Sequence, residues 1–360
     1  MTIVYFIIML GIIIIIHELG HMLFAKLFNV YVKEFAIGFG PRLWSHRTKE
    51  TVYSIRAIPL GGFTAMADEM DDHIEDQSEK DDSSLPPDLP KERTFNGVKP
   101  WKRIIIMLAG PLFNILLASV VFIAIITVNG GISEAPKPVI ASVVDGMPAA
   151  QAGMQAGDLI VKVTYSDGSS IKPDTFSDIV QYTELYHDAA IYTVQRGAQT
   201  LEFTITPQYD TETTRYMIGV TSGDYTFKSM NFLQAVPAGI GLCWEVTLLT
   251  LKALANLFKG IGLDSLSGTI GIYKSTEQAV SYGFMTYLSL IGSLSVNLAL
   301  MNLLPIPLFD GGRILITIIE TIIGHRLSIK TQNILMYGSL VLLFGLLIIV
   351  TYKDIVKYFL

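Results

Sequence analysis

Three apolar runs in this sequence are each long enough to cross a lipid bilayer as a helix. They extend from about residue 3 to 28, from 104 to 128 and from 334 to 352. A bilayer core of about 30 Å needs about 20 helical residues. The composition agrees, since 51% of the 360 residues are hydrophobic, 16% are charged and the mean hydropathy is +0.47. These values are too apolar for ordinary soluble domains, so the sequence predicts a membrane protein.

A fourth apolar run, residues 287 to 310, is interrupted by polar and helix-breaking residues. It contains Asn297, Asn302, Pro305 and Pro307. Irregular backbone of this kind is tolerated at membrane depth only where protein or a water-filled cavity surrounds it. We therefore expect this run to lie in the interior of the molecule.

Residues 235 to 258 form a further apolar run of different character. They include Pro237, Glu245 and Lys252, and their apolar residues recur at helical spacing. This pattern favours a helix that lies in the membrane interface and does not cross it. The predicted core therefore has four transmembrane helices. The single Cys243 cannot form an internal disulfide, so no redox chemistry is indicated.

The segment between the first two helices has a mixed composition. Residues 35 to 44 and 51 to 63 resemble short strands punctuated by glycine, which predicts a small sheet near the membrane. Residues 68 to 92 hold eleven acidic residues against two lysines. This composition is typical of a disordered, solvated linker.

Basic residues indicate which side of the membrane this segment occupies. The residues before Ile16 include no Lys or Arg, whereas several cations flank the other ends of the first two helices. Cytoplasmic loops carry such an excess of Lys and Arg, so the acidic loop is expected in the cytoplasm. The flanking cations are Lys26, Lys33, Lys99, Lys102 and Arg103.

The segment from residue 130 to 228 alternates apolar and polar residues as a soluble domain does. It predicts a strand resuming at Leu159, a helix near residues 176 to 184 and two strands joined by a tight turn at Arg196 and Gly197. The stretch GMPAAQAGMQAGDLI resembles the SPAxxAGLxxGDxI pattern of bacterial PDZ domains, with Met147 in place of the usual Ser. A generic small α+β module is the alternative. PDZ domains bind a chain end or an extended peptide by strand addition.

The first apolar run contains the sequence HELGH, which is costly inside a membrane. Burying one charge at the centre of a membrane helix costs about 2.5 to 3.5 kcal/mol even on lenient scales. His17 and His21 are four residues apart and share a helix face, so both can bind one zinc ion, while Glu18 can act as general base on a zinc-bound water. The alternatives are a chance match, or histidines that only satisfy hydrogen bonds in a helix bundle.

A site with two histidines needs a third protein ligand and an open position for water. Asp310, in NLLPIPLFDGG at the end of the interrupted run, is the best candidate. It could equally be the N-cap of a helix that follows a turn. Spacing alone leaves these two interpretations open.

Together these motifs resemble the site-2 protease family of intramembrane zinc metalloproteases, in particular its bacterial regulator-of-sigma-E protease branch. The likeness covers nearly the whole chain, because GFGPRLW, RAIPLGGF, TFNGVKPWKRIIIMLAGPLFN and SGTIGIYKSTEQA follow in family order. The resemblance implies Zn²⁺ bound by His17, His21 and Asp310, with Glu18 as general base. It also implies that Asn302 holds the substrate backbone and that Asn114 helps to organise the site.

The resemblance also has limits. Well-studied members of the branch carry two tandem PDZ domains, whereas this chain has room for one, and the acidic linker matches no family motif. The family's membrane-associated β-hairpin corresponds to residues 35 to 63. An exposed edge strand in this region could hold an unwound substrate, and the candidate residues are Tyr53, Ile55, Ala57 and Ile58. The sequence does not identify an oxyanion stabiliser.

The chemistry constrains the topology. If His17 and Asp310 bind one ion, the first and third helices must cross the membrane in the same sense. A full span at residues 235 to 258 would invert the third helix and separate the ligands, which favours the interfacial placement. The PDZ-like domain and both termini then face outward, and the site lies near the cytoplasmic side of a bacterial inner membrane.

The predicted fold class is a membrane protein with a four-transmembrane-helix core, a membrane-associated β-hairpin region and one inserted PDZ-like α+β domain. The predicted segments are 1–28 (helix 1), 29–67 (β region), 68–99 (acidic linker), 100–129 (helix 2), 130–228 (PDZ-like domain), 229–284 (interfacial helix and linker), 285–328 (interrupted helix 3) and 329–360 (helix 4).

The predicted function is hydrolysis of peptide bonds in or near transmembrane segments. The expected partners are the lipid bilayer and membrane-protein substrates such as an anti-sigma factor, a signal-peptide remnant or a peptide precursor, with no nucleic acid. A metal or ion transporter should show inverted repeats, and none is apparent. A catalytically silent PDZ scaffold is the other alternative.

Overall fold

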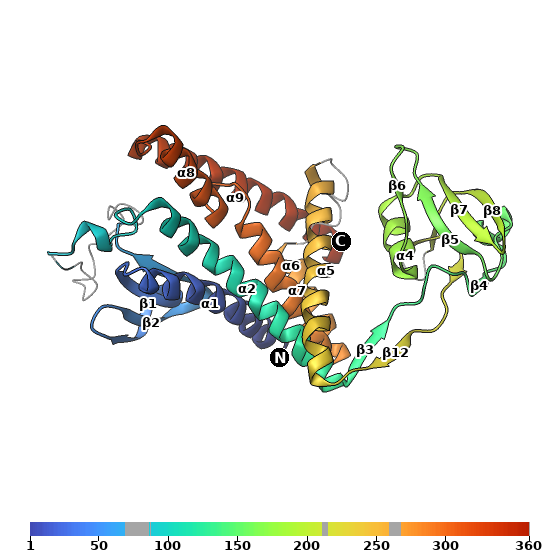
Figure 1. Cartoon of the computed structure of the whole chain (residues 1–360), viewed down its shortest axis with the longest axis horizontal. Coiled ribbons are helices and arrows are strands. Elements are labelled where there is room, and N and C mark those ends of the chain that lie inside the picture. The colour runs from blue at the N-terminus through green and yellow to red at the C-terminus, as the bar shows by residue number, and fades with distance from the viewer. Residues whose placement is uncertain (69–85, 87, 211–214, 259–267, 360) are drawn as a thin grey trace. The chain divides into compact units, whose positions relative to one another are not determined.

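The computed structural model describes residues 1–68, 86, 88–210, 215–258 and 268–359 (Figure 1). They form two compact units, one of Met1–Ile126 with Gln234–Leu360 and the other of Thr127–Leu233. The helices are α1 (Thr2–Leu27), η2 (Lys91–Arg93, a 3-10 turn), α2 (Pro100–Asn129), α3 (Pro148–Ala152), α4 (Phe176–Leu185), α5 (Phe232–Phe258), α6 (Thr269–Tyr282), α7 (Phe284–Asn302), α8 (Asp310–Ile323) and α9 (Ile329–Phe359). The strands are β1 (Val32–Arg47), β2 (Val52–Met66), β3 (Gly131–Glu134), β4 (Ser142–Val143), β5 (Leu159–Thr164), β6 (Ser170–Ile171), β7 (Ala190–Arg196), β8 (Gln199–Ile205), β9 (Gln208–Asp210), β10 (Arg215–Met217), β11 (Val220–Thr221) and β12 (Thr226–Ser229). The predicted acidic linker falls largely on residues 69–85 and 87, outside the described part of the chain.

Helices α1, α2 and α7 form the centre of the helical unit. Gly20 of α1 lies so close to α2 that a Cβ there would stand 2.4 Å from the carbonyl oxygen of Ala109. Small residues permit this close approach between membrane helices. Helix α7 runs parallel to α1, because the Tyr287 hydroxyl donates to the Tyr5 carbonyl (2.8 Å) near the start of both helices. Further along, the Asn302 amide lies 3.2 Å from the ring of His17.

Helix α5 packs along this bundle, antiparallel to α2. Gly239 lies against Ile123, and the Cys243 thiol lies 3.7 Å from the carbonyl oxygen of Ile115. Thr250 donates to the side chain of Asn297 on α7 (2.7 Å). Five helices of the described chain are long and apolar enough to cross a membrane, and α5 is one of them. The predicted four-helix core is therefore not confirmed.

The short helix α6 explains why a passage by α5 does not invert α7. Helices α5 and α7 both run parallel to α1, so the chain must return between them. Helix α6 lies in this interval and packs on the start of α1, where the rings of Phe6 and Tyr273 are 5.8 Å apart. Asp354 of α9 accepts backbone N–H bonds from Gly268 (3.0 Å) and Gly271 (2.9 Å), which caps α6. Because α5 and α7 run in the same direction, a crossing by α5 does not invert α7, contrary to the prediction.

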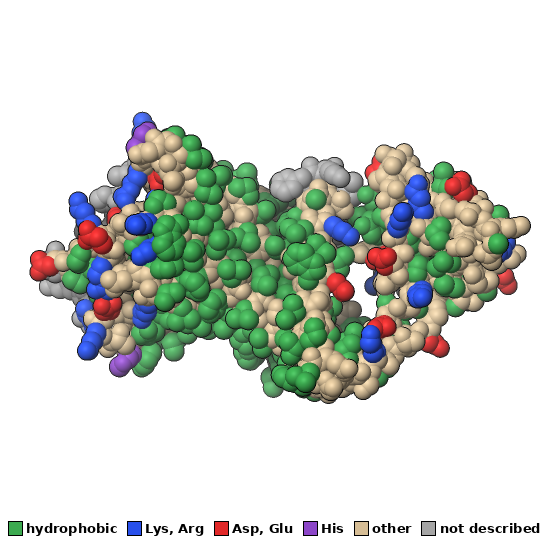
Figure 2. All heavy atoms as spheres, in the orientation of Figure 1, with side chains coloured by type: hydrophobic (Ala, Val, Ile, Leu, Met, Phe, Trp, Pro, Cys, Tyr) green, Lys and Arg blue, Asp and Glu red, His purple; other side chains and the backbone are tan. Residues whose placement is uncertain are grey.

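The surface of the helical unit is divided by polarity. Figure 2 shows hydrophobic side chains over the visible face of the helices, while Lys, Arg, Asp and Glu gather at the end that carries β1 and β2. A broad apolar surface with charged residues gathered at one end is typical of helices that pass from the hydrocarbon core of a bilayer into its interface. Together with the five apolar helices, this division identifies a multi-pass membrane protein.

Strands β1 and β2 form the predicted hairpin, but both are long and bent. Residues 62–66 of β2 pair with the first part of β1, whereas residues 52–55 lie beside two parts of β1, at 34–37 and at 44–47. The hairpin therefore makes a sheet four segments wide. Glu34 is buried beneath it and receives hydrogen bonds from Arg42, Ser54 and Arg56. Burial would raise the pKa of Glu34, but these donors overcome that effect and lower it.

The second unit contains a sheet with strand order β6-β5-β7-β8. The predicted strand at Leu159, helix near 176–184 and tight turn at Gly197 are confirmed by β5, α4 and a φ of 60° at Gly197. Asp158 is fully buried and binds the Arg196 guanidinium through both carboxylate oxygens (2.7 and 2.8 Å). These hydrogen bonds lower the pKa of Asp158. At the base of the unit β3 pairs with β12, so the first and last strands are adjacent.

Candidate metal centre and active site

Helix α1 presents His17 and His21 on one face, as their spacing predicts. Both are buried, with exposed fractions of 6% and 5%. Their Nε2 atoms lie 3.2 Å apart. Two imidazole nitrogens at this separation can share a single metal ion.

Asp310 comes to the same point from the first residue of α8. Its Oδ2 atom lies 3.2 Å from Nε2 of His17 and 3.3 Å from Nε2 of His21. The N-cap of α8 is Phe309, and no side chain caps this helix. The N-cap interpretation of Asp310 is therefore wrong.

Two glycines allow the chain to fold back tightly before α8. A Cβ on Gly311 would lie 2.2 Å from the carbonyl oxygen of Leu303, and one on Gly312 would lie 2.1 Å from that of Ile306. Helix α7 ends at Asn302, and Pro305 and Pro307 prevent regular helix from continuing between the two. This tight fold directs Asp310 back toward α1.

The three ligand atoms fit a zinc ion. Ligands at about 2.0 to 2.1 Å from a tetrahedral zinc stand about 3.3 to 3.4 Å apart, and the three separations here are 3.2, 3.2 and 3.3 Å. Oδ2 of Asp310 is buried without a hydrogen-bond partner. Two imidazoles and one carboxylate are a donor set typical of catalytic zinc, with a fourth position left for water or substrate.

Neighbouring groups orient the histidine rings. Nδ1 of His21 donates to the carbonyl oxygen of Ile106 (2.8 Å), which turns the lone pair of Nε2 toward the site. Nδ2 of Asn114 lies 3.3 Å from Nδ1 of His17, while Oδ1 of Asn114 is buried without a hydrogen-bond partner. Asn302 lies on the opposite nitrogen of the same ring, 3.2 Å from Nε2. The structure thus brings both predicted asparagines to the site.

Glu18 lines the same cavity as the three candidate ligands. This cavity has a volume of about 350 Å³. The Glu18 side chain stands over Gly62 of β2, where an added Cβ would lie 3.7 Å from its Cγ. The Thr64 hydroxyl donates to the Glu18 carbonyl (2.9 Å), which ties β2 to α1 beside the site. The other lining residues are Lys33, Phe63, Ala65, Met66, Met107, Leu308 and Arg313.

The predicted substrate strand lies in a different part of the sheet from the cavity. Tyr53 and Ile55 have strand partners on both sides, Phe35 and His46 for Tyr53 and Ile37 and Trp44 for Ile55. The prediction of an exposed edge at these two residues is therefore wrong. Ala57 and Ile58 are exposed, but neither lines the cavity. The edge segment that does line it is residues 63–66. The strand pairs of a doubly bent hairpin cannot be read from its sequence.

Gly110 of α2 makes two close approaches to the histidine rings that the sequence did not predict. A Cβ on Gly110 would lie 2.3 Å from Nε2 of His21 and 2.8 Å from Cε1 of His17. Gly110 therefore makes room for both rings against α2. The sequence shows this glycine in AGP, but only the helix packing reveals what it faces.

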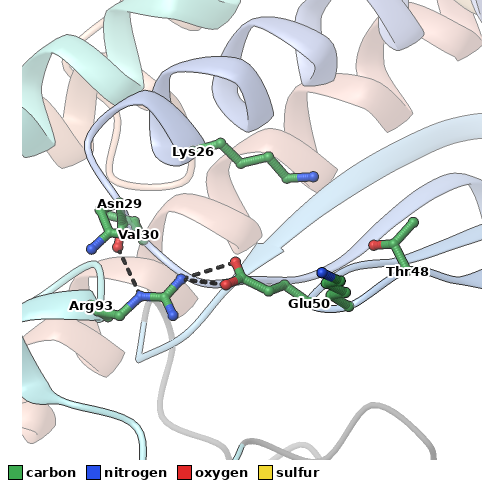
Figure 3. Close-up of a pocket in the computed structure, with 7 residues that line it drawn as sticks. Lys26, Asn29, Val30, Thr48, Glu50 and Arg93 are labelled. Carbon is green, nitrogen blue, oxygen red and sulfur yellow. Dashed lines mark hydrogen bonds and ion pairs between the residues drawn. The ribbon is translucent and has the colours of Figure 1, made fainter.

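A second cavity, of about 380 Å³, lies where α1 meets the β1–β2 turn. Figure 3 shows Arg93 reaching from η2 to the Glu50 carboxylate, at 2.9 and 3.0 Å, and to the carbonyl oxygen of Asn29. Lys26 and Thr48 line the same cavity. The lining offers no metal-ligand set, so this cavity is separate from the candidate metal centre.

Comparisons with known proteins agree with this geometry. Residues 5–346 match the family model described as peptidase family M50. The chain is 30% identical to the regulator of sigma-W protease RasP of Bacillus subtilis, over 100% of this chain and 99% of that protein. It is 33% identical to a Clostridium acetobutylicum protein described as a zinc metalloprotease, over 99% and 97% of the two chains.

Among solved structures, a PDZ domain of an SdrC-like protein from Listeria monocytogenes matches 25% of this chain and 90% of its own length, with 23% identity and a TM-score of 0.21. That likeness is too weak to identify the second unit. The family match, in contrast, covers residues 5–346, and the two relatives match 99% or more of the chain. This chain therefore belongs to peptidase family M50, the site-2 proteases, and is a zinc metalloprotease.

Proposed function

We propose that this protein hydrolyses peptide bonds in or next to transmembrane segments of membrane proteins, in regulated intramembrane proteolysis. One observation carries the proposal. Three converging ligand atoms and a carboxylate share one cavity among helices that are apolar enough to cross a membrane. We assign His17, His21 and Asp310 as the zinc ligands and Glu18 as the general base.

The chain's own residues account for the proton transfers. A zinc ion held by His17, His21 and Asp310 would supply a polarising charge for the scissile carbonyl and would lower the pKa of a water molecule. Glu18 takes the proton of the attacking water and passes it to the leaving amine. We propose that the Asn302 amide, which lies 3.2 Å from Nε2 of His17, donates a hydrogen bond to the substrate backbone.

An unwound substrate would bind along residues 63–66 of β2. A helical substrate hides its peptide bonds, so cleavage requires an extended segment. This stretch is an edge of the sheet, lines the catalytic cavity and is tied to α1 through Thr64. Strand addition uses main-chain hydrogen bonds, so it does not depend on one substrate sequence.

Charge distribution and relatives support the orientation and the partners that we propose. Lys26, Lys99 and Lys102 flank the ends of α1 and α2, which favours a cytoplasmic position for this end of the helices and an outward position for the second unit. The relative named as a regulator of sigma-W protease points to an anti-sigma factor as the substrate class, in a bacterial inner membrane. We propose that the second unit is PDZ-like and filters substrates.

The test is cleavage of a synthetic transmembrane peptide by the purified protein, with bound zinc measured in parallel. Glu18→Gln should keep the fold and one zinc ion but lower turnover by about 10² to 10⁴-fold, because the amide has the shape of the acid without its basicity. Glu245→Gln, on the exposed face of α5, is the matched control and should cleave normally. Near-normal turnover of Glu18→Gln, or a wild-type protein that binds zinc without cleaving, would contradict the proposal.

A further inference from the structure

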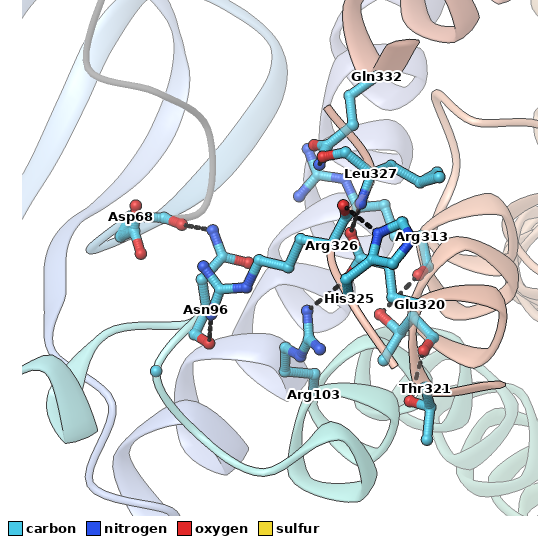
Figure 4. Close-up of polar contacts among 12 residues, drawn as sticks. Asp68, Asn96, Arg103, Arg313, Glu320, Thr321, His325, Arg326, Leu327 and Gln332 are labelled. Carbon is cyan, nitrogen blue, oxygen red and sulfur yellow. Dashed lines mark hydrogen bonds and ion pairs between the residues drawn. The ribbon is translucent and has the colours of Figure 1, made fainter. Parts of the chain in front are cut away.

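An ion pair is buried between α2 and α8, away from the proposed ligands. Arg103 and Glu320 each have an exposed fraction of 6%, and Nη1 of Arg103 lies 3.2 Å from Oε2 of Glu320. Figure 4 shows the two side chains reaching toward each other from their helices. The positive-inside pattern predicts Arg103 as one of the flanking cations, but the structure pairs it with Glu320.

Stability alone does not explain this pair. A buried ion pair gains little over a well-packed apolar pair, because both charges lose their hydration. Here Nε of Arg103 is also buried without a hydrogen-bond partner. Such pairs can instead fix one arrangement of packed elements among several. In this protein, the arrangement that the pair can fix is the position of α8 relative to α2.

Helix α8 has little apolar packing, although Ile314 packs against the hydrophobic cluster that contains Met22 and Ile106. The structure describes all of α8, and its buried residues are only Gly311, Gly312, Thr317 and Glu320. Large apolar side chains of the helix, such as Leu315 and Ile322, are 41% and 78% exposed. Polar contacts therefore help to set the rotation of α8 and its position along its axis. Oε1 of Glu320 also accepts the backbone N–H of Leu327 (3.1 Å), so this residue fixes the far end of the helix.

One face of α2 contacts both histidines of the metal centre. Residues 103, 106, 110 and 114 are spaced by three, four and four, which places them on one helix face. Along it, Ile106 binds the ring of His21, Gly110 makes room for both rings and Asn114 lies beside His17. Arg103 extends this face by one turn and binds Glu320, ten residues and about 15 Å along α8 from Asp310.

We propose that Arg103 and Glu320 are positioning residues that hold α8 in register with α2 and so aim the Asp310 carboxylate at the two histidines. The inference rests on the proposed ligation of zinc by Asp310. Without the pair, α8 can turn or slide on its glycine contacts, and the carboxylate moves relative to the imidazoles. Neither residue touches the metal or the substrate.

The experiment measures metal binding by the full-length protein in detergent, apart from activity. The variants are Glu320→Gln, Arg103→Met and the double variant Arg103→Met/Glu320→Met. Zinc affinity is measured by chelator competition, and the visible spectrum of the cobalt(II)-substituted protein reports ligand geometry. The control is Asp354→Asn, which removes a buried carboxylate that ties α9 to α6, far along the chain from any ligand.

Each single variant should weaken zinc binding by about 10- to 100-fold, as loss of supporting contacts does in other zinc sites, and should change the cobalt spectrum. It should also lower kcat for a transmembrane peptide with little change in KM. The double variant should regain Tm, since it leaves no unpaired charge, but not zinc affinity. Asp354→Asn should lower Tm and keep zinc affinity and the spectrum.

Zinc affinity within about twofold of wild type in both Glu320→Gln and the double variant would overturn the inference. So would an equal loss in Asp354→Asn, since the effect would then follow general stability. Failure of the proposed function looks different. In that case the wild-type protein itself binds no zinc or cleaves no peptide, whatever the variants do.

Discussion

At the scale of single residues, Gly110 decides whether two imidazole rings can face one ion. Gly110→Ala would place a methyl group 2.3 Å from Nε2 of His21, so α1 and α2 must move apart or the ring must turn. We expect loss of most bound zinc and of cleavage, measured by metal analysis and peptide hydrolysis. Gly338→Ala is the control, because position 338 of α9 has open space around it. It should be neutral or raise stability by up to about 1 kcal/mol.

Asp310 provides the sharpest residue-scale test of the metal centre. Asp310→Ala removes one of three ligand atoms, and Asp310→Asn replaces the charged oxygen by a weaker neutral donor. We expect reduced zinc occupancy and loss of cleavage in both, since catalytic zinc sites rely on three protein ligands. Full occupancy with near-normal cleavage in both variants would remove Asp310 from the site.

At the scale of elements, the position of α5 separates two topologies. If α5 crosses the bilayer, its ends lie on opposite sides, because positions 233 and 255 are about 33 Å apart along a helix. Single cysteines at Leu233 and Ala255, in a Cys243→Ser background, should react with an impermeant maleimide from opposite faces of the membrane. Labelling of both from one face would restore the interfacial placement.

The bounds of the helices and strands show which parts of the fold can be predicted from local sequence. Helix α1 is shifted by one residue from the predicted run 3–28, and α2 and α9 extend the runs 104–128 and 334–352 by one to seven residues at each end. The agreement is close because hydropathy follows burial in lipid and needs no knowledge of neighbours. The sequence predicts that a hairpin forms here, but it does not predict which segment of the hairpin lies at the edge of the sheet. Which segment of β2 lies at the edge depends on how two long strands bend and pair, and that is a long-range property.

At the scale of the whole molecule, the second unit is built as an insertion. The backbone N–H of Met230 donates to the carbonyl oxygen of Gly130 (2.8 Å), so the two ends of the unit meet. Replacing residues 131–229 by a short Gly-Ser linker should therefore leave α2 and α5 in place. We expect cleavage of an already trimmed substrate to persist, and discrimination against substrates with bulky outer domains to weaken. Complete loss of activity in a folded deletion would contradict a filtering role.

The sequence by itself determined the membrane setting, the number of long apolar runs and the chemistry of the candidate site. His17, Glu18 and His21 could be read as a unit because they lie within one helical turn, where spacing fixes geometry. Asp310 could be named, but its role stayed open between ligand and helix cap. Only the tertiary structure brought its carboxylate to 3.2 Å from His17 and left the cap position to Phe309. The return through α6, the approach of Gly110 and the pairing of Arg103 with Glu320 were also beyond the sequence. Each depends on contacts between helices far apart in the chain, and such contacts are set by packing and not by local pattern.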